Sequence, residues 1–299
     1  MRYNFEKTEN CEMCGSSSEG HKLLGLRLNR SQGLHPKRKG GIAVSIYKCL
    51  SCGLLYSDPM PIPENIQDHY GKPPEEYWKG SYFKIDPNYF TTQIKQARAL
   101  LGDIKIKSLD IGAGLGKAMI AMEAQGFDAF GLEPSQPFYE RAISEMKVKE
   151  ERLELGSVES SEYPDSTFDF ITFGAVFEHL YHPAESLEKA LRWLKPNGII
   201  HIEVPSSNWL IAKIIDIYYS LRGTNYTTHL SPMHTPYHLY EFSIGSFHKL
   251  GQRLNFKTEV HQIDTGSVYF FPKFTHGMIK KIMNWTKTGM QLTVYLRKV

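Results

Sequence analysis

Residues 108–116, Ser-Leu-Asp-Ile-Gly-Ala-Gly-Leu-Gly, decide the fold of this chain. A short apolar strand carries Asp110 near its end, and three glycines at alternating positions then lead into an amphipathic run. Glycine takes up positive φ freely and lets the backbone approach a ligand with no Cβ in between. The helix that follows would point its free N–H groups toward that place. Many strand-to-helix turns carry such glycines, so the meaning of this one depends on the rest of the chain.

Strands and helices alternate after the glycine loop. The run 168–173 is almost continuously apolar, as in strands of a parallel sheet that are buried on both faces. This alternation predicts a doubly wound α/β domain, closed at one edge by an antiparallel pair near the end of the chain. The predicted strands are 107–111, 127–132, 153–157, 168–173, 198–204, 256–263 and 290–298, with helices over 90–101, 117–125, 137–147, 183–194, 208–221 and 246–254.

Composition excludes several classes of protein. The chain is 41% hydrophobic and 22% charged, as ordinary globular proteins are. Its net charge of +3 is too small to require a nucleic-acid partner. No apolar run approaches the roughly 20 residues that span a bilayer, and the N-terminal stretch lacks the apolar segment of a signal peptide. We therefore expect a cytoplasmic protein with no membrane partner, whose oligomeric state the sequence does not indicate.

All four cysteines lie before residue 53, as Cys11-x-x-Cys14 and Cys49-x-x-Cys52, and a glycine follows each pair. Disulfides are typical of secreted domains, whereas two such pairs in this context predict a tetrahedral four-cysteine zinc site. We expect a zinc ribbon over 1–57, with strands at 21–28 and 42–47 and a hairpin through 40–41. The basic cluster 37–39 is interpreted as a solvated loop rather than a nucleic-acid contact.

Residues 58–103 are expected to connect the ribbon to the main domain. Prolines make 57–63 a stiff linker, because each fixes φ and disfavours helix before it. The aromatic segment 70–83 that follows is interpreted as a cap over a site, with Tyr77 as a cofactor contact, or as packing against the main domain.

An acid follows the second predicted strand of the main domain. Glu133 lies about 20 residues past the glycine loop, where doubly wound folds place a carboxylate beside the ribose hydroxyls of a nucleoside. The loop and the spaced acid together are far more specific than the loop alone, although a dinucleotide would also fit them.

From about residue 104 to 264 the chain resembles the class I S-adenosylmethionine (SAM)-dependent methyltransferases. The resemblance implies a doubly wound, seven-stranded Rossmann-like sheet in a domain over 104–299, with a lid insertion at about 206–237. Five blocks carry it in the family's order: 109–116 (LDIGAGLG), 131–135 (GLEPS), 168–180 with its FEHL loop, 194–198 (LKPNG) and 238–243 (HLYEFS).

The resemblance also implies roles for individual residues. The glycine loop would hold the methionine part of SAM, Asp110 its amino group and Glu133 both ribose hydroxyls. Residues after the third and fourth strands would lie beside the adenine and the sulfonium. The implied cofactor contacts are Asp110, Gly112, Ala113, Gly114, Glu133, Pro134, Ser135, Ser157 and Val158 (adenine), Gly174 and Ala175 (sulfonium), together with Tyr77.

Methyl transfer to a hydroxyl or a carbon acid requires a base. His179 is the first candidate, His238 the second, and Glu178 could orient either ring; structural roles for these histidines are the alternative. Related enzymes bind a divalent metal with an acid three residues before the equivalent of Glu178, but here that position is Ala175, so no catalytic metal is expected. His229 and His234 are expected in the lid, where they could simply be solvated.

The cysteine pairs, the proline stretch and the aromatic segment are similar to the N-terminal part of zinc-ribbon methyltransferases, including sugar C-methyltransferases. The favoured function is methyl transfer to an oxygen or carbon of a sugar, nucleotide-sugar or natural-product intermediate. A zinc-ribbon RNA methyltransferase is one alternative, supported by the six Lys and Arg and absence of acids after Asp264. The Asn/Asp-Pro-Pro-Tyr-type loop used for exocyclic amines is absent. A non-catalytic SAM-binding protein is the other alternative.

Overall fold

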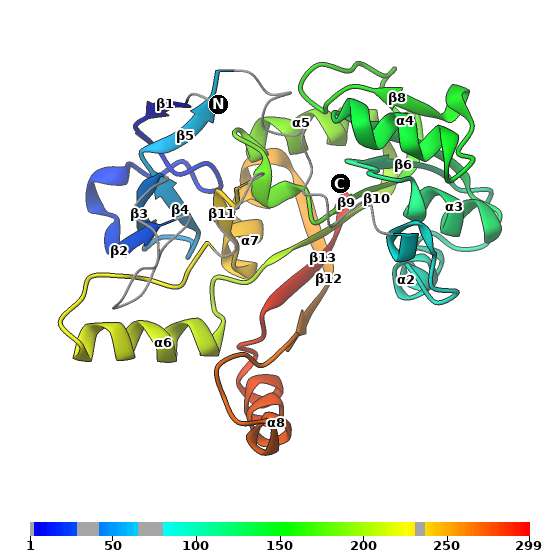
Figure 1. Ribbon diagram of the computed structural model, residues 1–299. Coiled ribbons are helices and arrows are strands. Elements are labelled where there is room, and N and C mark those ends of the chain that lie inside the picture. Colours follow the sequence, from blue (N-terminus) through cyan, green and yellow to red (C-terminus); the bar gives the residue numbers. More distant parts are fainter. Residues whose placement is uncertain (1–2, 29–41, 65–79, 231–236) are drawn as a thin grey trace.

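The computed structural model describes residues 3–28, 42–64, 80–230 and 237–299. Its main element is a seven-stranded sheet in the order β12-β13-β10-β9-β6-β7-β8 (Figure 1). The strands are β6 (Lys107–Ile111), β7 (Asp128–Glu133), β8 (Leu153–Leu155), β9 (Phe168–Gly174), β10 (Leu194–Pro205), β12 (Phe256–Asp264) and β13 (Gln291–Lys298).

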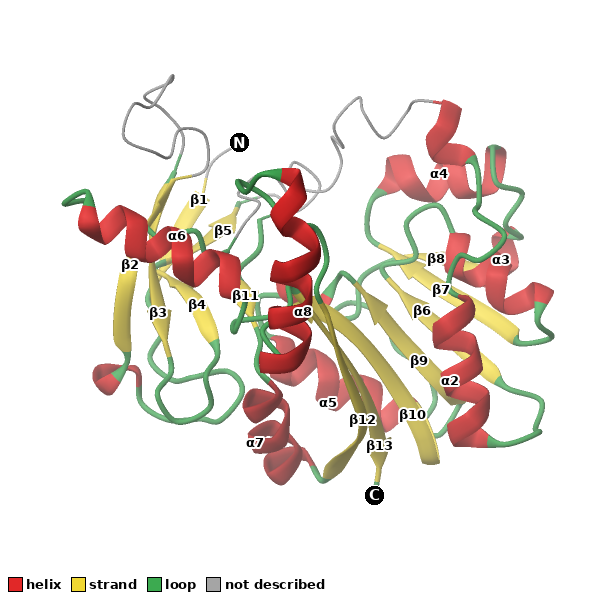
Figure 2. Cartoon of the chain, turned by 90° about the horizontal axis from the view of Figure 1, so that it is seen from below, coloured by secondary structure: helices red, strands yellow, loops and turns green. Residues whose placement is uncertain are grey.

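Strands β6 to β10 are parallel, and β13 runs antiparallel between β10 and β12. The predicted doubly wound sheet and its closing antiparallel pair are therefore confirmed. The helices α2 (Thr91–Leu101), α3 (Lys117–Ala124), α4 (Gln136–Ser144), α5 (Pro183–Trp193) and α7 (Ile244–Leu254) lie beside the sheet (Figure 2).

Two hydrophobic cores cover the two faces of this sheet. Successive residues of a strand point to opposite faces, and accordingly Phe170 belongs to one core and Ile171 to the other. The Phe170 side is covered by α2, α3 and α4, and the Ile171 side by α5 and α7. Burial on both faces explains the almost continuous apolar run of β9.

A four-stranded sheet joins the N-terminal module to the main domain. It has the order β11-β4-β3-β2, from β2 (Lys22–Leu28), β3 (Ala43–Lys48), β4 (Leu55–Asp58) and β11 (Tyr240–Glu241). The strand β11 comes from the late block 238–243, nearly 200 residues from β4 along the chain. The cysteine-bearing module thus shares a sheet with the domain that follows it.

The proline-rich stretch is part of these small sheets. Residues 57 and 58 end β4, and β5 (Met60–Pro63) pairs antiparallel with β1 (Tyr3–Glu6). A two-stranded sheet consists only of edge strands, where proline is tolerated because its missing N–H need not join a ladder. The stretch that we expected as a linker is therefore extended, as its prolines require, but it is also paired.

Two helices project from the carboxyl edge of the large sheet. The helix α6 (Leu210–Leu221) follows β10 and matches the predicted helix over 208–221, whereas α8 (His276–Thr286) was not predicted. None of the helices in the described ranges combines the length and the apolar character that crossing a bilayer requires.

Hydrogen bonds at the start of α7 hold the N-terminal module in place. The Ser243 hydroxyl accepts from the Ser246 N–H as a helix cap and donates to the Cys52 carbonyl at 2.6 Å. A second hydroxyl, on Ser207, donates to the Gly53 carbonyl at 2.9 Å. The second cysteine pair is therefore bonded to the main domain by side chains of that domain.

We predict that Ser243→Ala lowers the free energy of unfolding by about 1–2 kcal/mol, because it removes a helix cap and leaves the Cys52 carbonyl without that donor. Urea denaturation followed by circular dichroism measures the change. Ser220→Ala, at an exposed position of α6, is the control and should change stability by less than about 0.5 kcal/mol. Equal stability of the two variants would contradict the bridging role of Ser243.

Candidate functional site

The glycine loop lies at the carboxyl edge of the parallel strands. Gly112, Gly114 and Gly116 have φ of +73°, +57° and +71°, a region that other residues rarely adopt. A Cβ on Gly112 would lie 2.4 Å from a methyl group of Val176, so the loop after β6 packs directly against the loop after β9. A Cβ on Gly114 would meet nothing within 4 Å, which leaves its outer side open to a ligand.

Glu133 ends β7 with its side chain buried against this loop. One carboxylate oxygen accepts from the Gly114 N–H at 2.6 Å and the other from the Ser135 N–H at 2.7 Å. Burial raises the pKa of Glu133 to about 7, although these two hydrogen bonds act in the opposite direction. Each carboxylate oxygen has a second lone pair, so the group can also accept from the two hydroxyls of a ribose.

Asp110 is also buried at this edge. Burial, and then the charge of Glu133, raises its pKa to about 8. Burial raises the pKa of Glu203 on β10 as well, and the side-chain amides of Gln93 and Gln291 donate to its carboxylate at 3.3 and 2.6 Å. The buried Asp110 and Glu133 and the half-buried Glu203 therefore lie at one edge of the sheet.

Two residues of this environment, Tyr89 and Glu203, were not predicted from the sequence. The phenol of Tyr89 lies close enough to Asp110 and Glu203 for their charges to raise its pKa, after burial, to about 12. Glu203 itself interrupts the apolar run of β10, and an acid within an otherwise buried strand is the signal that could have found it. Tyr89 gives no comparable signal, because it precedes α2 within a segment rich in aromatic residues.

The remaining predicted cofactor contacts follow their strands as expected but differ in exposure. Val158 packs its side chain into the hydrophobic core, and the Ser157 hydroxyl lies 3.2 Å from that of Ser160. Gly174, the last residue of β9, and Ala175, which follows it, are exposed, and Ala175 adopts a φ of +55°. Left-handed backbone at a residue other than glycine is a form of strain that clusters at functional sites. Pro134 and Ser135 connect Glu133 to α4.

The three predicted catalytic residues come together. Oε1 of the buried Glu178 lies 4.0 Å from Nε2 of His179 and 3.9 Å from Nε2 of His238. The two imidazole rings meet edge to face, with centroids 4.8 Å apart. The block 238–243, which pairs with the N-terminal module, therefore brings His238 to the loop after β9.

Hydrogen bonding determines how His179 is protonated. Its Nδ1 lies 2.8 Å from the Tyr237 carbonyl, which can only accept, so Nδ1 carries the proton. In the neutral ring Nε2 is then the nitrogen that can accept a proton, and it lies toward Glu178 and His238.

Glu178 is close to fully buried and has one carboxylate oxygen, Oε2, with no hydrogen-bond partner among the described residues. Burial, and secondarily Glu203, raises the pKa of Glu178 to about 8. These three side chains also form a group whose ligand atoms lie within 4.8 Å of one another and can hold a metal ion. The expectation of no catalytic metal rested on the absence of an acid at position 175. The group in the structure includes His238 and does not need that acid.

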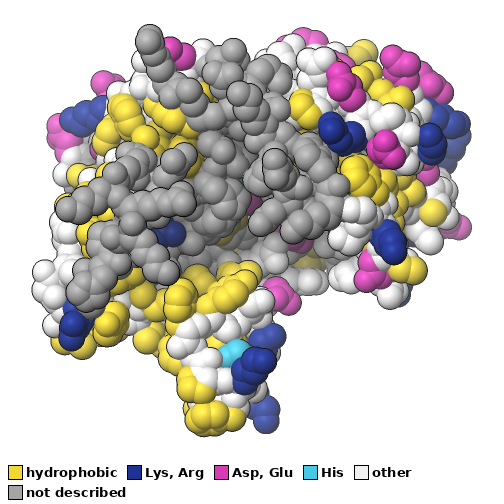
Figure 3. Space-filling view, in the orientation of Figure 1, with side chains coloured by type: hydrophobic (Ala, Val, Ile, Leu, Met, Phe, Trp, Pro, Cys, Tyr) yellow, Lys and Arg dark blue, Asp and Glu magenta, His cyan; other side chains and the backbone are white. Residues whose placement is uncertain are grey.

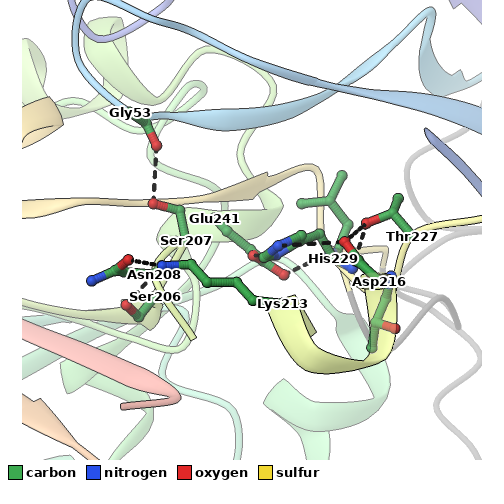
Figure 4. Close-up of polar contacts among 11 residues, drawn as sticks. Gly53, Ser206, Ser207, Asn208, Lys213, Asp216, Thr227, His229 and Glu241 are labelled. Atoms are coloured by element: carbon green, nitrogen blue, oxygen red, sulfur yellow. Dashed lines mark hydrogen bonds and ion pairs between the residues drawn. The ribbon is translucent and has the colours of Figure 1, made fainter. Parts of the chain in front are cut away.

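His229 lies in a separate buried cluster (Figure 4). Its Nδ1 is 2.6 Å from the Glu241 carboxylate, and Asp216 on α6 lies 3.8 Å from its Nε2. Burial alone would lower the pKa of His229, but these two carboxylates outweigh it and the pKa lies above its ordinary value. The possibility that His229 is simply solvated is therefore wrong, because its ring is enclosed between β11 and α6.

The four cysteines meet as predicted. The sulfur atoms of Cys11 and Cys52 are 3.6 Å apart, those of Cys14 and Cys49 are 3.5 Å apart, and all four lie within 4.8 Å of one another. Tetrahedral coordination with bonds of about 2.3 Å requires sulfur atoms separated by about 3.8 Å. The cluster can therefore hold one zinc ion. Tyr77, His234, the basic cluster 37–39 and the predicted hairpin at 40–41 lie outside the described residues.

Comparison with known proteins agrees with this arrangement. The family model of the methyltransferase domain matches residues 87–261. The ubiquinone biosynthesis O-methyltransferase of Schizosaccharomyces pombe is 32% identical over 133 residues, which cover 43% of this chain and 47% of that protein. An uncharacterized methyltransferase of the same organism is 31% identical over 31% of this chain and 37% of its own length. The chain thus matches less than half of the length of either relative.

Among solved structures, a SAM-dependent methyltransferase of Archaeoglobus fulgidus covers 75% of this chain and all of its own, at 15% identity and a TM-score of 0.49. The family match spans more than half of the chain and includes the glycine loop, the buried acids at the sheet edge and the Glu178–His179 loop. The chain therefore belongs to the methyltransferase domain family.

Proposed function

We propose that this enzyme transfers the methyl group to an oxygen or carbon of a small molecule, such as a sugar, a nucleotide-sugar or a natural-product intermediate, with His179 as general base. The observation that carries the proposal is the meeting of Glu178, His179 and His238 at the sheet edge beside the glycine loop. When bound, SAM supplies an electrophilic methyl group on a cationic sulfur.

Buried acids support the cofactor part of the proposal. Asp110 and Glu133 share one edge of the sheet, and both pKa values are raised by burial. A cation placed among carboxyl groups lowers their pKa values and is in turn stabilised by the carboxylates. We assign Asp110 to the cofactor's amino group and Glu133 to its ribose, with the open side of Gly114 facing the methionine part.

The fixed tautomer of His179 supports the base assignment. Because Nδ1 donates to the Tyr237 carbonyl, Nε2 can accept a proton from an acceptor hydroxyl or carbon acid. Glu178 in its carboxylate form would stabilise the imidazolium across the 4.0 Å separation, and the positive charge on the ring would in turn lower the raised pKa of Glu178. His238 is positioned to contact the acceptor or to relay the proton.

We also infer that Cys11, Cys14, Cys49 and Cys52 bind one structural zinc ion. Thiolates at this spacing are unfavourable neighbours unless a cation neutralises them. Since β4 and the Cys52 carbonyl are bonded to β11 and Ser243, the ion would support the segment that carries His238 as well.

For the base, His179→Ala should lower kcat by about 10²- to 10⁴-fold and leave SAM affinity within about twofold, because only the proton acceptor is lost. Release of S-adenosylhomocysteine is measured with nucleotide-sugars and phenols as one set of acceptors and unmodified RNA as the other. His182→Ala is the matched control, since that ring lies three residues away and is 55% exposed.

Unchanged turnover in His179→Ala would remove His179 from the base role. Turnover of RNA alone would overturn the small-molecule assignment and establish the RNA methyltransferase alternative.

For the cofactor site, SAM binding at about pH 7 should release protons, on the order of one per cofactor, because the free carboxyl of Asp110 is largely protonated there and a nearby cation lowers its pKa. Titration calorimetry in buffers of different ionisation enthalpy measures the release. Asp110→Asn should release fewer protons and bind more weakly, whereas the exposed Asp165→Asn should match the wild type. Proton uptake by the wild type would contradict the assignment.

For the zinc site, the purified chain should contain one zinc ion, and Cys49→Ser should lower both zinc content and the free energy of unfolding, the latter by more than about 2 kcal/mol. Elemental analysis and urea denaturation measure the two quantities. Ser51→Ala, at an exposed position between the second pair of cysteines, is the control. Full stability without bound metal would show that the cysteines are not a zinc site.

A further inference from the structure

We propose that α8 and the turn before it form an interfacial anchor that binds the surface of an anionic lipid membrane. The anchor is defined by an exposed apolar stripe, Phe274, Met278, Ile282 and Trp285, and by the exposed lysines Lys273, Lys280, Lys281 and Lys287.

The stripe is exposed although it is apolar. Phe274 is 88% exposed and Trp285 is 84% exposed, and Met278 and Ile282 lie between them. The spacing of four, four and three residues places all of these side chains on one side of a helix. Phe270, at 83% exposure, precedes them in the same segment. Contiguous apolar surface of this kind marks an interaction site.

The opposite side of α8 holds the stripe in place. Ile279 and Met283 are buried in a small core with Ile211 of α6 and Val268. The helix therefore has two apolar sides, one packed against the protein and one turned to solvent. Packing of the first side fixes the direction in which the second is presented.

The charges that this segment itself carries are of one sign. The four lysines of the anchor are exposed, and the sequence contains no acid after Asp264. Figure 3 shows hydrophobic side chains and dark-blue cationic side chains side by side on the lower projection of the molecule, where Figure 1 places α8. At helical spacing Lys281 lies beside the stripe, whereas Lys280 lies on the far side of α8 from it. An apolar helix face accompanied by Lys is the pattern of helices that lie in the headgroup region of a bilayer.

A second helix carries a similar stripe. On α6 the exposed apolar side chains are Ile214, Ile217, Tyr218 and Leu221, again at helical spacing. Figure 2, seen from below, shows α6 and α8 on the same side of the molecule. The two helices together widen the apolar surface that can enter the headgroup region.

The anchor lies at the edge of the sheet that carries the candidate site. The residue Gln291, which starts β13 directly after α8, pairs with Pro205 at the carboxyl end of β10. The strands β6 and β9 end at this same edge, and the glycine loop and the Glu178–His179 loop follow them. Binding through α8 would therefore hold the site toward the membrane rather than away from it.

A lipid surface fits this face better than a second copy of the chain. Two copies meeting through α8 would bring their four lysines together with no acid of the same segment to neutralise them. Anionic headgroups neutralise the lysines while the acyl region accepts Phe274 and Trp285.

Flotation of the full chain with vesicles tests the proposal. Vesicles of phosphatidylcholine and phosphatidylglycerol are compared with vesicles of phosphatidylcholine alone. Phe274→Ser/Trp285→Ser should weaken binding to the anionic vesicles by about tenfold or more, since two apolar anchors are lost. The matched control is Leu23→Ser/Ile104→Ser, which also replaces two exposed apolar residues, 53% and 47% exposed, in other parts of the molecule.

Lys280→Gln/Lys281→Gln should weaken binding to the anionic vesicles by about tenfold and abolish most of its salt dependence, and the wild type should bind neutral vesicles less tightly. Absence of binding by the wild type, or equal binding by the Phe274/Trp285 and control variants, would overturn the proposal. A dimer in ultracentrifugation that only Phe274→Ser/Trp285→Ser dissociates, without vesicle binding, would assign the face to a second copy instead.

Discussion

The hydrogen-bonded carboxylate of Glu133 is the interaction on which the organisation of the site depends. A buried carboxylate is costly unless donors compensate it, and here two backbone N–H groups do so, one from the glycine loop and one from the turn before α4. This arrangement fixes the loop after β6 to the loop after β7. Gly112, packed against Val176, then fixes the same loop to the segment that carries Glu178 and His179. The carboxyl ends of β6, β7 and β9 are thereby held in one arrangement.

The N-terminal module contributes to this arrangement rather than standing apart from it. Its strand β4 pairs with β11. The residues just before β11 include Tyr237, whose carbonyl orients His179, and His238, which lies beside that ring. A metal bound by the cysteines would stabilise this sheet through the connection between β3 and β4, which contains Cys49 and Cys52. The buried pair of His229 and Glu241 closes the same region against α6. Cysteine cluster and candidate base are thus parts of one folded unit.

Much of the fold and part of the site could be predicted from the sequence, because local patterns of residue type and spacing indicate those parts. The alternation of apolar strands and amphipathic helices predicted the sheet. The spacing between the glycine loop and Glu133 predicted a carboxylate at the end of the second strand of the main domain, but not its hydrogen bond to the loop. The pairing of strands that lie far apart along the chain could not be predicted from such local patterns. The strand β11 has only two residues, too few for a periodic pattern, and its position depends on β4. The helix α8 was missed because it has apolar side chains on both its buried and its exposed sides, which conceals amphipathic spacing.

The central claim is that the buried carboxylate at the end of β7 recognises the cofactor. Titration calorimetry of SAM with Glu133→Gln measures it most directly, with the exposed Glu140→Gln of α4 as the matched control. Glu133→Gln should weaken SAM binding by about tenfold or more, since a charge-assisted acceptor for the ribose hydroxyls is lost, while Glu140→Gln should bind as the wild type does. Equal affinity of the two variants for SAM would contradict it.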